Sequence, residues 1–184
     1  NFDLTHLNNS PASFNTQKLD WVNQHYLKTL PPQNIAPQLA WQFTLMNIDT
    51  QNGPALADII TAQAERCKTL KEMAEKSAFF FQDIKEYDAA AVEKNLNSTT
   101  LPLLQHLHTT FSELSEWTPQ EAHAVVANAA ETLNLKLGQV AQPLRVAITG
   151  GSVSPSIDVT LSLLGKKVVL ARIEDFKTLI ESAK

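Results

Sequence analysis

The residues best suited to binding a phosphate or a nucleic-acid base lie in the stretch LRVAITGGSVSPSID, around a pair of glycines. Arg145 precedes an apolar run that ends in Gly150-Gly151, and Ser154 and Pro155 follow. This order predicts a loop leading into a helix, with Ser154 as the N-cap and Pro155 at the first helical position. Backbone N–H groups at such a terminus can bind a phosphate or the edge of a base. Arg145 is predicted to share that surface.

A nucleotide-cofactor loop is the first alternative, because strand, glycine turn, helix and strand also describe a βαβ unit. In this interpretation residues 146–149 and 168–170 would be strands. A dinucleotide loop requires G-x-G-x-x-G after a strand, and only two adjacent glycines occur here. A parallel strand pair must also be buried on both faces, and the remaining sequence predicts no sheet for it to join. A small nucleotide-binding α/β domain is therefore the less favoured hypothesis.

No other combination of residues predicts catalysis or a metal site. His106 and His108 are two positions apart, so a helix would point them about 200° apart. Cys67 is the single cysteine, which excludes an internal disulfide and a cysteine-rich zinc site. The sequence shows neither a nucleophile with a convincing neighbouring base nor an apolar run long enough to span a membrane. We expect no catalytic residue, no metal, no membrane partner and a cytoplasmic protein.

The charge of the chain is negative overall and unevenly distributed. A net charge of −4 at pH 7 argues against general nucleic-acid binding, and we expect no DNA partner. Residues 83–131 hold eight acidic residues and two lysines, a net charge of −6, whereas residues 136–172 carry +4. This asymmetry suggests that the C-terminal third faces an anion. The second alternative is a helical protein-interaction module whose acidic middle segment docks a partner.

The first elements of the chain are predicted to be helices. Apolar residues recur every three or four positions between 19 and 30, which predicts a helix that Pro31-Pro32 ends. Trp21, on this helix, is predicted to lie in the core. A second helix is predicted over 34–47, with Pro37 in its first turn.

Capping signals predict further helices in the middle of the chain. Thr69 with Glu72 three residues later is a capping box, and Thr118–Glu121 adds a proline at the first helical position. The helix after Thr118 is predicted to end at Gly138. Phe79–Phe81 cannot all lie on one face of a helix, and core packing is their predicted role. Eight to ten helices and no alternating strand are expected in all.

Three segments of the sequence resemble bacterial glutamyl-tRNA synthetases. PLRVAITGG, with the following SPSIDVTLSLLGKK and LARIE, resembles the C-terminal end of that family. SPASFNTQKLDWVNQHYLK at 10–28 and ERCKTLKEMAEKSAFFFQD at 65–83 resemble earlier parts, in the family's order. The stretches EYDAAAVEKNL and EWTPQEAHAVV are similar to its proteobacterial members. The resemblance extends over the whole chain.

The resemblance implies an all-α fold, a multihelical anticodon-binding region of two helical subdomains. Residues 1–31 would be the tail of the stem-contact region, 32–87 the first subdomain and 88–184 the second. The sequence begins with Asn and shows no HIGH-type or KMSKS-type signature. We therefore expect a fragment that is inactive alone and carries no cofactor, with ATP and Mg²⁺ used by a separate catalytic domain. The expected partner is glutamate tRNA, bound by a monomer.

The family's tRNA contacts map onto six residues of this chain. By resemblance, Arg66 contacts the third anticodon base and Arg145 the first. Lys18 matches a lysine near the tRNA stem. Three further residues match positions beside the first anticodon base: Ser154, Pro155 and Ile157.

Arg66 is the position that carries the predicted specificity. Discriminating members of the family have arginine there, so the resemblance implies an enzyme that rejects glutamine tRNA. The alternative for Arg66 is a structural one, capping its helix or pairing with a nearby glutamate. This chain also departs from the family, because many members have Thr in place of Ser154 and Gly in place of Ser156. The hydroxyl group survives at Ser154, whereas the close approach of backbone to base at Ser156 is in doubt.

Overall fold

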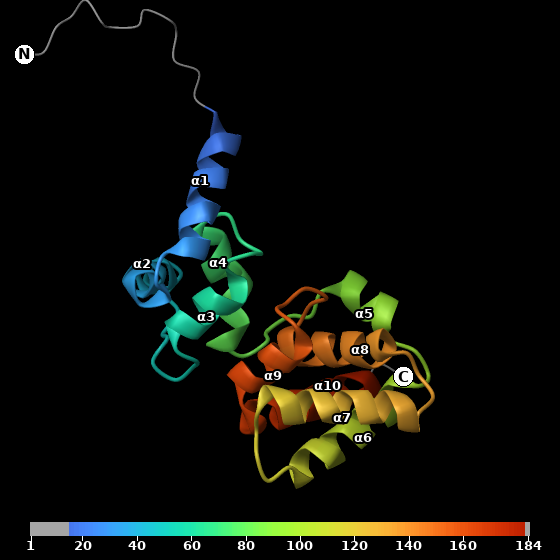
Figure 1. Ribbon diagram of the computed structural model, residues 1–184. Coiled ribbons are helices and arrows are strands. Elements are labelled where there is room, and N and C mark those ends of the chain that lie inside the picture. Colours follow the sequence, from blue (N-terminus) through green and yellow to red (C-terminus); the bar gives the residue numbers. More distant parts are fainter. Residues whose placement is uncertain (1–14, 183–184) are drawn as a thin grey trace, which may run out of the picture.

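The computed structural model describes residues 15–182. The first 14 residues of the predicted stem-contact tail, 1–31, therefore lie outside the described residues. Within residues 15–182 the chain is helical and contains no β-strand, which confirms the all-α prediction (Figure 1). In chain order the elements are α1 (Thr16–Thr29), α2 (Pro32–Leu45), α3 (Leu56–Gln63), α4 (Leu70–Ser77), the 3₁₀ helix η2 (Ala78–Phe80), α5 (Ala89–Asn95), α6 (Thr100–Glu113), α7 (Pro119–Thr132), α8 (Leu137–Thr149), α9 (Ile157–Leu164) and α10 (Lys166–Ser182).

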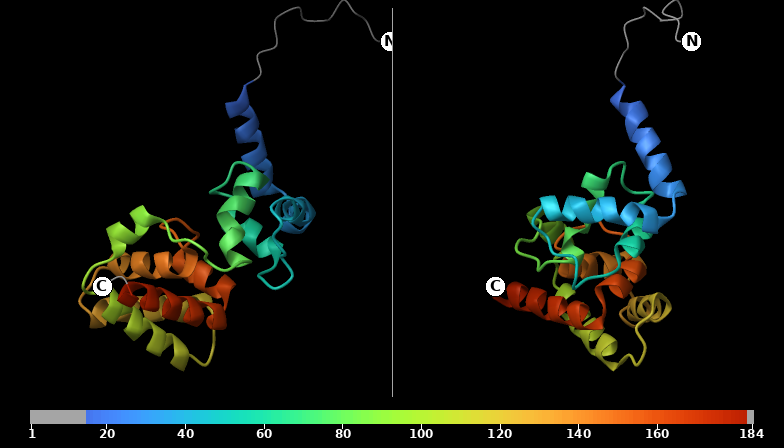
Figure 2. Two further views of the ribbon diagram at one scale, coloured as in Figure 1. Left: turned by 180° about the vertical axis from the view of Figure 1, so that it is seen from behind. Right: turned by 90° about the vertical axis from the view of Figure 1, so that its left-hand side faces the viewer.

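The helices form two groups. In the first group, α1–η2, helix α2 packs against α3 and α4; in the second group, α5–α10 pack against one another. Figures 1 and 2 show the groups side by side, joined by the segment between η2 and α5. The subdomain boundaries at residues 31 and 87 stay a prediction.

The α/β alternative is wrong for this chain. Residues 146–149 form the last turn of α8, and residues 168–170 lie near the start of α10. Short apolar runs occur in buried helices as well as in buried strands, so their composition alone could not decide. Val146, Ala147 and Ile148 have no exposed surface, because this end of α8 is enclosed by its neighbours.

Helix α1 differs from its prediction because it projects from the body of the first group (Figures 1 and 2). Of its apolar residues only Leu27 is buried, while Leu19, Tyr26 and Leu30 are exposed. Trp21 is 65% exposed, so its predicted place in the core is wrong. The periodicity was sufficient to predict the helix but not what covers its apolar side.

The first group is built on apolar residues spaced by four along α2. Ile35, Leu39 and Phe43 are buried, and the ring of Phe43 contacts that of Phe81 with the centroids 4.9 Å apart. Phe80 is buried as well, so the predicted core role of the phenylalanine run is confirmed. Pro37 lies inside α2, beyond the first turn, because the helix begins at Pro32 and not at 34 as predicted.

In the second group, one predicted helix boundary agrees with the structure and another differs from it. Thr118 caps α7 as predicted, its hydroxyl oxygen accepting a hydrogen bond from the Glu121 N–H at 3.2 Å. Gly138, however, does not end α7. It lies in the first turn of α8, and Asn134, whose φ of 50° is left-handed, lies in the turn after α7.

The glycine pair forms the end of α8. Gly150 has a φ of 81° and is the C-cap of that helix. Its carbonyl oxygen accepts a hydrogen bond from the Asp88 N–H at 2.8 Å, and a Cβ at Gly150 would lie 2.9 Å from Ile84 Cγ2. The connecting segment between the two groups therefore lies directly against the glycine turn, which needs both the left-handed conformation and the missing side chain.

None of the helices in the described range is long and apolar enough to cross a membrane.

Gly150→Ala and Gly138→Ala make a matched pair within α8. The first is expected to lower the free energy of unfolding by about 1–2 kcal/mol, because a side chain in the left-handed conformation costs that much. Gly138 has open space around it, and alanine there should raise stability by up to about 1 kcal/mol. Urea denaturation measures both. Equal effects of the two substitutions would contradict the separate roles of the glycines.

Candidate nucleic-acid interface

The six predicted contact residues occupy three places in the structure. Arg66 is exposed on the turn between α3 and α4, and Arg145 is half-buried near the end of α8. Ser154 and Pro155 lie in the loop before α9, and Ile157 begins that helix. The α3–α4 turn and the α8–α9 loop lie on facing sides of the two groups (Figures 1 and 2).

Lys18 is separated from the other predicted residues. It is exposed in the first turn of α1, at the end of that helix that points away from the second group (Figure 1). Its backbone N–H donates to the Asn15 side chain at 3.1 Å, which caps the helix. A contact of Lys18 with RNA would therefore be distinct from one at the two arginines.

The turn that carries Arg66 is held by α1 on one side. The Gln24 amide donates to the Glu65 carbonyl oxygen at 3.1 Å. Lys28 Nζ lies 3.4 Å from the Glu65 carboxylate, in an exposed pair that contributes little stability by itself. These contacts fix the backbone next to Arg66 while leaving its side chain exposed.

Helix α4 holds the same turn on the other side. Lys76 Nζ donates to the Arg66 carbonyl oxygen at 3.3 Å and to Glu72 at 2.7 Å. The other oxygen of Glu72 accepts from the Lys68 N–H at 2.7 Å, and these bonds hold the pKa of Glu72 below its usual value. Thr69 caps α4 as predicted, accepting from the Glu72 N–H at 3.1 Å. One structural alternative for Arg66 had predicted an ion pair with a nearby glutamate, and Arg66 forms no such pair among residues 15–182.

Arg145 is held in place by the loop before α9. Its Nη1 donates to the Pro155 carbonyl oxygen at 2.6 Å and to the Ser154 hydroxyl. The Ser154 hydroxyl in turn lies 3.0 Å from the Thr160 hydroxyl on α9. Ser154 is only 5% exposed, so its side chain orients Arg145 and is not itself an open contact surface.

The helix that follows the loop begins later than predicted. Ser156, not Ser154, is the N-cap of α9, and the helix starts at Ile157 and not at Pro155. Ser154 is drawn away from a capping role because its hydroxyl bonds to Arg145 and Thr160. Pro155 and Ile157 are buried like Ser154. The three residues therefore help to position Arg145 and offer little exposed surface for a direct contact with RNA.

The two arginines lie close enough to influence one another. Burial lowers the pKa of the Arg145 guanidinium, and the positive charge of Arg66 lowers that pKa further, while Asp158 opposes the shift. A guanidinium nevertheless stays charged in proteins and has only donors. Two like charges brought together from separate groups of helices form a site for hydrogen-bond acceptors, anionic or neutral.

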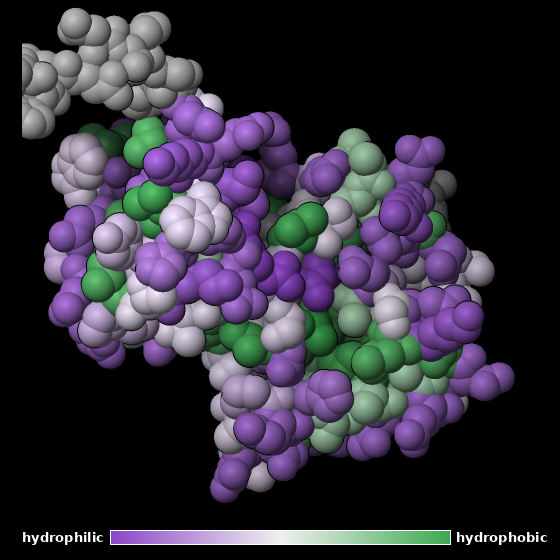
Figure 3. Space-filling model, turned by 45° about the horizontal axis from the view of Figure 1, so that its top comes forward, coloured by the Kyte–Doolittle hydropathy of each residue, from purple (hydrophilic) through white to green (hydrophobic). Residues whose placement is uncertain are grey.

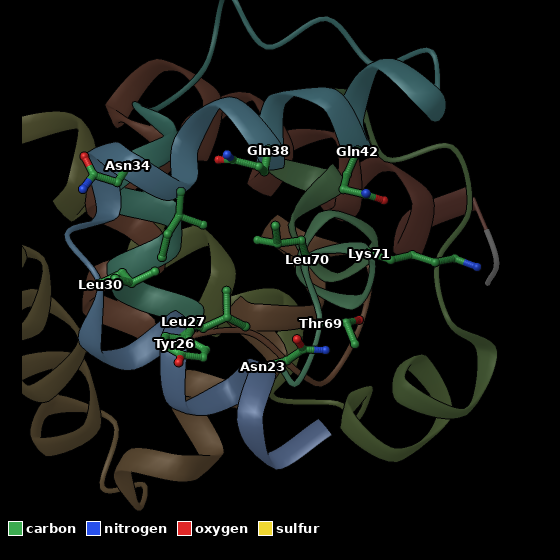
Figure 4. A pocket seen from close by; sticks show the side chains of 11 residues that line it. Asn23, Tyr26, Leu27, Leu30, Asn34, Gln38, Gln42, Thr69, Leu70 and Lys71 are labelled. Carbon is green, nitrogen blue, oxygen red and sulfur yellow. The ribbon is translucent and has the colours of Figure 1, made fainter. Parts of the chain in front are cut away.

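The surface around this site is mixed. Figure 3, which views the upper side of the molecule, shows hydrophilic and hydrophobic residues where the two groups of helices adjoin. Val153, in the loop before α9, is 70% exposed. A pocket of about 440 Å³ lies elsewhere, between α1, α2 and the start of α4. Asn34, Gln38 and Gln42 follow one another along its α2 wall, with Lys71 across from them (Figure 4). Neither Arg66 nor Arg145 lines that pocket.

Residues 25–177 match the family described as anticodon binding domain. The chain belongs to this family. As an anticodon-binding domain, it is 46% identical over 173 residues to glutamate–tRNA ligase 2 of Coxiella burnetii (strain Dugway 5J108-111), and equally to ligase 1 of strain RSA 331 / Henzerling II. Each alignment covers 94% of this chain and 37% of the relative. The chain thus spans little more than a third of these ligases, and the predicted resemblance is confirmed.

Solved structures give the same result for the fold of the anticodon-binding domain. A glutamate tRNA ligase from Elizabethkingia meningosepticum superposes with a TM-score of 0.83 at 26% identity, over 96% of this chain and 35% of that chain. The glutamate-tRNA synthetase of Elizabethkingia anophelis gives 0.77 at 26% identity, over 95% and 34%.

Two residues that organise the anticodon-binding domain were not found from the sequence. Thr160, whose hydroxyl meets Ser154, is one of several threonines inside predicted helices and carries no distinguishing pattern. Arg172 is 7% exposed and, in the part of the chain that the structure describes, donates only to backbone carbonyls, so no acidic partner at helical spacing indicates its role. The available signal was its rarity, because the chain has three arginines.

Cys67, next to Arg66, provides a test of how tightly the turn is packed. Its side chain has no exposed surface, and burial raises the pKa of the thiol from 9.0 to about 11. Below pH 9 the thiol is protonated in the folded and unfolded chains alike. Above pH 9 the unfolded chain loses its proton first, so the contribution of Cys67 to stability is lost as pH rises through about 11.

The comparison with Cys67→Ala isolates this effect. Between about pH 8 and about pH 10.5, the wild type should lose roughly 2 kcal/mol more unfolding free energy than the variant. Denaturant titrations at the two pH values measure the difference. Parallel losses in the two proteins would mean that the thiol is open to solvent and that the turn is loose.

Proposed function

We propose that this chain recognises the anticodon arm of glutamate tRNA as the RNA-binding part of a glutamate–tRNA ligase. The observation that carries the proposal is the match of this chain to the anticodon-binding family, in which Arg66 lies exposed on an anchored turn and Arg145 is held by the loop before α9. Anticodon bases are single-stranded and can be splayed out, so a protein can bind their hydrogen-bonding edges. Two guanidinium groups on facing surfaces can each bind one base of the same loop.

Arg66 suits the third anticodon base. That base is C in glutamate tRNA and G in glutamine tRNA. The pairing edge of C offers the acceptors N3 and O2, whereas that of G presents N1–H and N2–H donors to an arginine that has only donors. A bidentate contact contributes roughly 1–3 kcal/mol of discrimination. The exposed side chain on an anchored turn leaves Arg66 able to reach such a base.

Arg145 suits the first anticodon base. Glutamate codons end in A or G, so by ordinary pairing that base is U or C, and both pyrimidines carry the acceptor O2. Nη1 of Arg145 is engaged by Ser154 and Pro155. Its Nη2 has no bond within residues 15–182 and remains available to donate to O2. Ser154, Pro155 and Ile157 act on the base through the position of Arg145.

The negative net charge is compatible with this proposal. RNA binding here requires a local site with a few donors, and a basic surface over the whole protein is not needed. Acceptor-stem contacts belong to the part of the ligases that this chain does not match, so we expect modest and strongly salt-dependent affinity. We assign ATP, Mg²⁺ and glutamate activation to that part as well. We further propose that the chain binds one tRNA as a monomer, in the cytoplasm.

A binding titration at low salt tests the proposal. Wild type is expected to bind glutamate tRNA roughly tenfold or more tightly than the same tRNA with G as its third anticodon base. Arg66→Gln should lose this preference, because the glutamine amide carries both a donor and an acceptor. Fluorescence anisotropy with labelled tRNA measures the four dissociation constants.

Lys136→Gln is the control for charge. It removes one positive charge at the start of α8, about 14 Å along the helix from Arg145. This variant should retain the preference for C. Equal binding of both tRNAs by the wild type, or a preference that persists in Arg66→Gln, would overturn the assignment.

A further inference from the structure

Arg172 on α10 is a buried cation that connects the two groups of helices. Its Nη1 donates to the Ile148 carbonyl oxygen at 2.6 Å. Its Nη2 donates to the carbonyl oxygens of Phe79 at 2.8 Å and Gln82 at 3.0 Å. Ile148 belongs to the second group, whereas Phe79 and Gln82 belong to the end of the first group and the segment after it. A single guanidinium therefore binds backbone from both sides.

The surroundings of Arg172 show that carbonyl groups, not carboxylates, compensate its charge. No ion pair to Arg172 occurs in the described part of the chain. Burial lowers the pKa of its guanidinium, and the negative charges of Asp83 and Asp175 only partly oppose this shift. A charge in such a place must be fully hydrogen-bonded to be tolerated. The three bonds to backbone are thus demanded by burial.

The backbone that Arg172 binds leads directly to both candidate base-binding residues. Ile148 is three residues after Arg145 on α8. Phe79 follows α4, the helix whose Lys76 binds the Arg66 carbonyl oxygen. The bond from Asp88 N–H to the Gly150 carbonyl oxygen closes the same joint at 2.8 Å. The position of Arg66 relative to Arg145 depends on this small set of contacts.

We propose that Arg172 is a positioning residue that fixes the spacing of Arg66 and Arg145, so that both engage one anticodon loop at once. This inference rests on the proposed function. Binding groups must be held to within roughly 0.5 Å of their productive geometry to contribute fully. When two contacts are rigidly connected, the first one raises the effective concentration of the second. A loosened joint would let each arginine bind but would remove the gain from binding together.

A distance measurement tests the mechanical part of the proposal. Cysteines introduced at two exposed positions, Lys71 on α4 and Lys167 on α10, take nitroxide labels, while the buried Cys67 with its raised pKa stays unreactive. Pulsed electron spin resonance of the labelled parent should give one narrow distance distribution. Arg172→Met should broaden it. An unchanged distribution in Arg172→Met would overturn the proposal.

Lys177→Met is the matched control on the same helix. Lys177 is 6% exposed, similar to Arg172, but within residues 15–182 its ammonium group bonds only to Glu174 of its own helix, at 2.7 Å. It should leave the distance distribution narrow. Should Arg172→Met fail to fold, Arg172→Lys serves instead, because it keeps the charge but lacks the planar fork that reaches both sides. Broadening by Lys177→Met equal to that by the Arg172 variant would also overturn the proposal.

Binding of glutamate tRNA tests the functional part. In the parent, Arg66→Gln should weaken binding roughly tenfold. In the Arg172→Lys background the same substitution should weaken it less than about threefold, since Arg66 then contributes little to a joint contact. A penalty that stays near tenfold in that background would overturn the positioning role. Absence of any penalty in the parent would instead refute the proposed function, and the distance measurement would still decide whether Arg172 fixes the joint.

Discussion

The buried guanidinium of Arg172 is the contact on which the arrangement of this molecule depends. Water cannot solvate it, and three carbonyl oxygens replace the solvent at 2.6–3.0 Å. One of them, that of Ile148, lies at the C-terminal end of α8, where the helix dipole also favours a positive charge. Removing any of the three acceptors would leave a buried donor without a partner, which is costly. The charge therefore holds together two groups of helices that otherwise pack mostly within themselves.

This constraint explains why the two candidate base-binding arginines are supported so differently. Arg145 lies on the helix whose end Arg172 binds, and it gives up one of its nitrogens to the α8–α9 loop. Its reach is thereby set by the fold. Arg66 keeps its side chain exposed, and only the backbone of its turn is anchored, by Gln24 and Lys76. The proposed contacts to two bases of one loop thus combine a donor group held by the fold with one whose side chain is free of the protein surface.

Local signals predicted the helices well and the joint between them poorly. Thr69 and Thr118 begin helices as their sequence neighbourhoods indicate, because a cap is decided within four residues. The position of Ser154 was mistaken for a cap because its partner Thr160 lies in the next helix. Trp21 was predicted to be buried and is exposed, whereas Arg172 is buried and its burial was not predicted. Burial is decided by contacts distant in sequence, which spacing does not reveal.

A glycine pair after an apolar run can belong either to a phosphate-binding loop or to the end of a helix that another segment of the chain approaches closely. Gly150 satisfies the conditions of a phosphate loop in part, with a left-handed turn and a close backbone approach. The partner that approaches it, however, is Ile84 of the connecting segment, and Gly150 accepts its hydrogen bond from Asp88. The space that a cofactor's phosphate would need is thus filled by the chain itself. Glycine is required here so that the end of α8 meets the segment that Arg172 also binds, which places the glycine turn and the buried arginine in one structural unit.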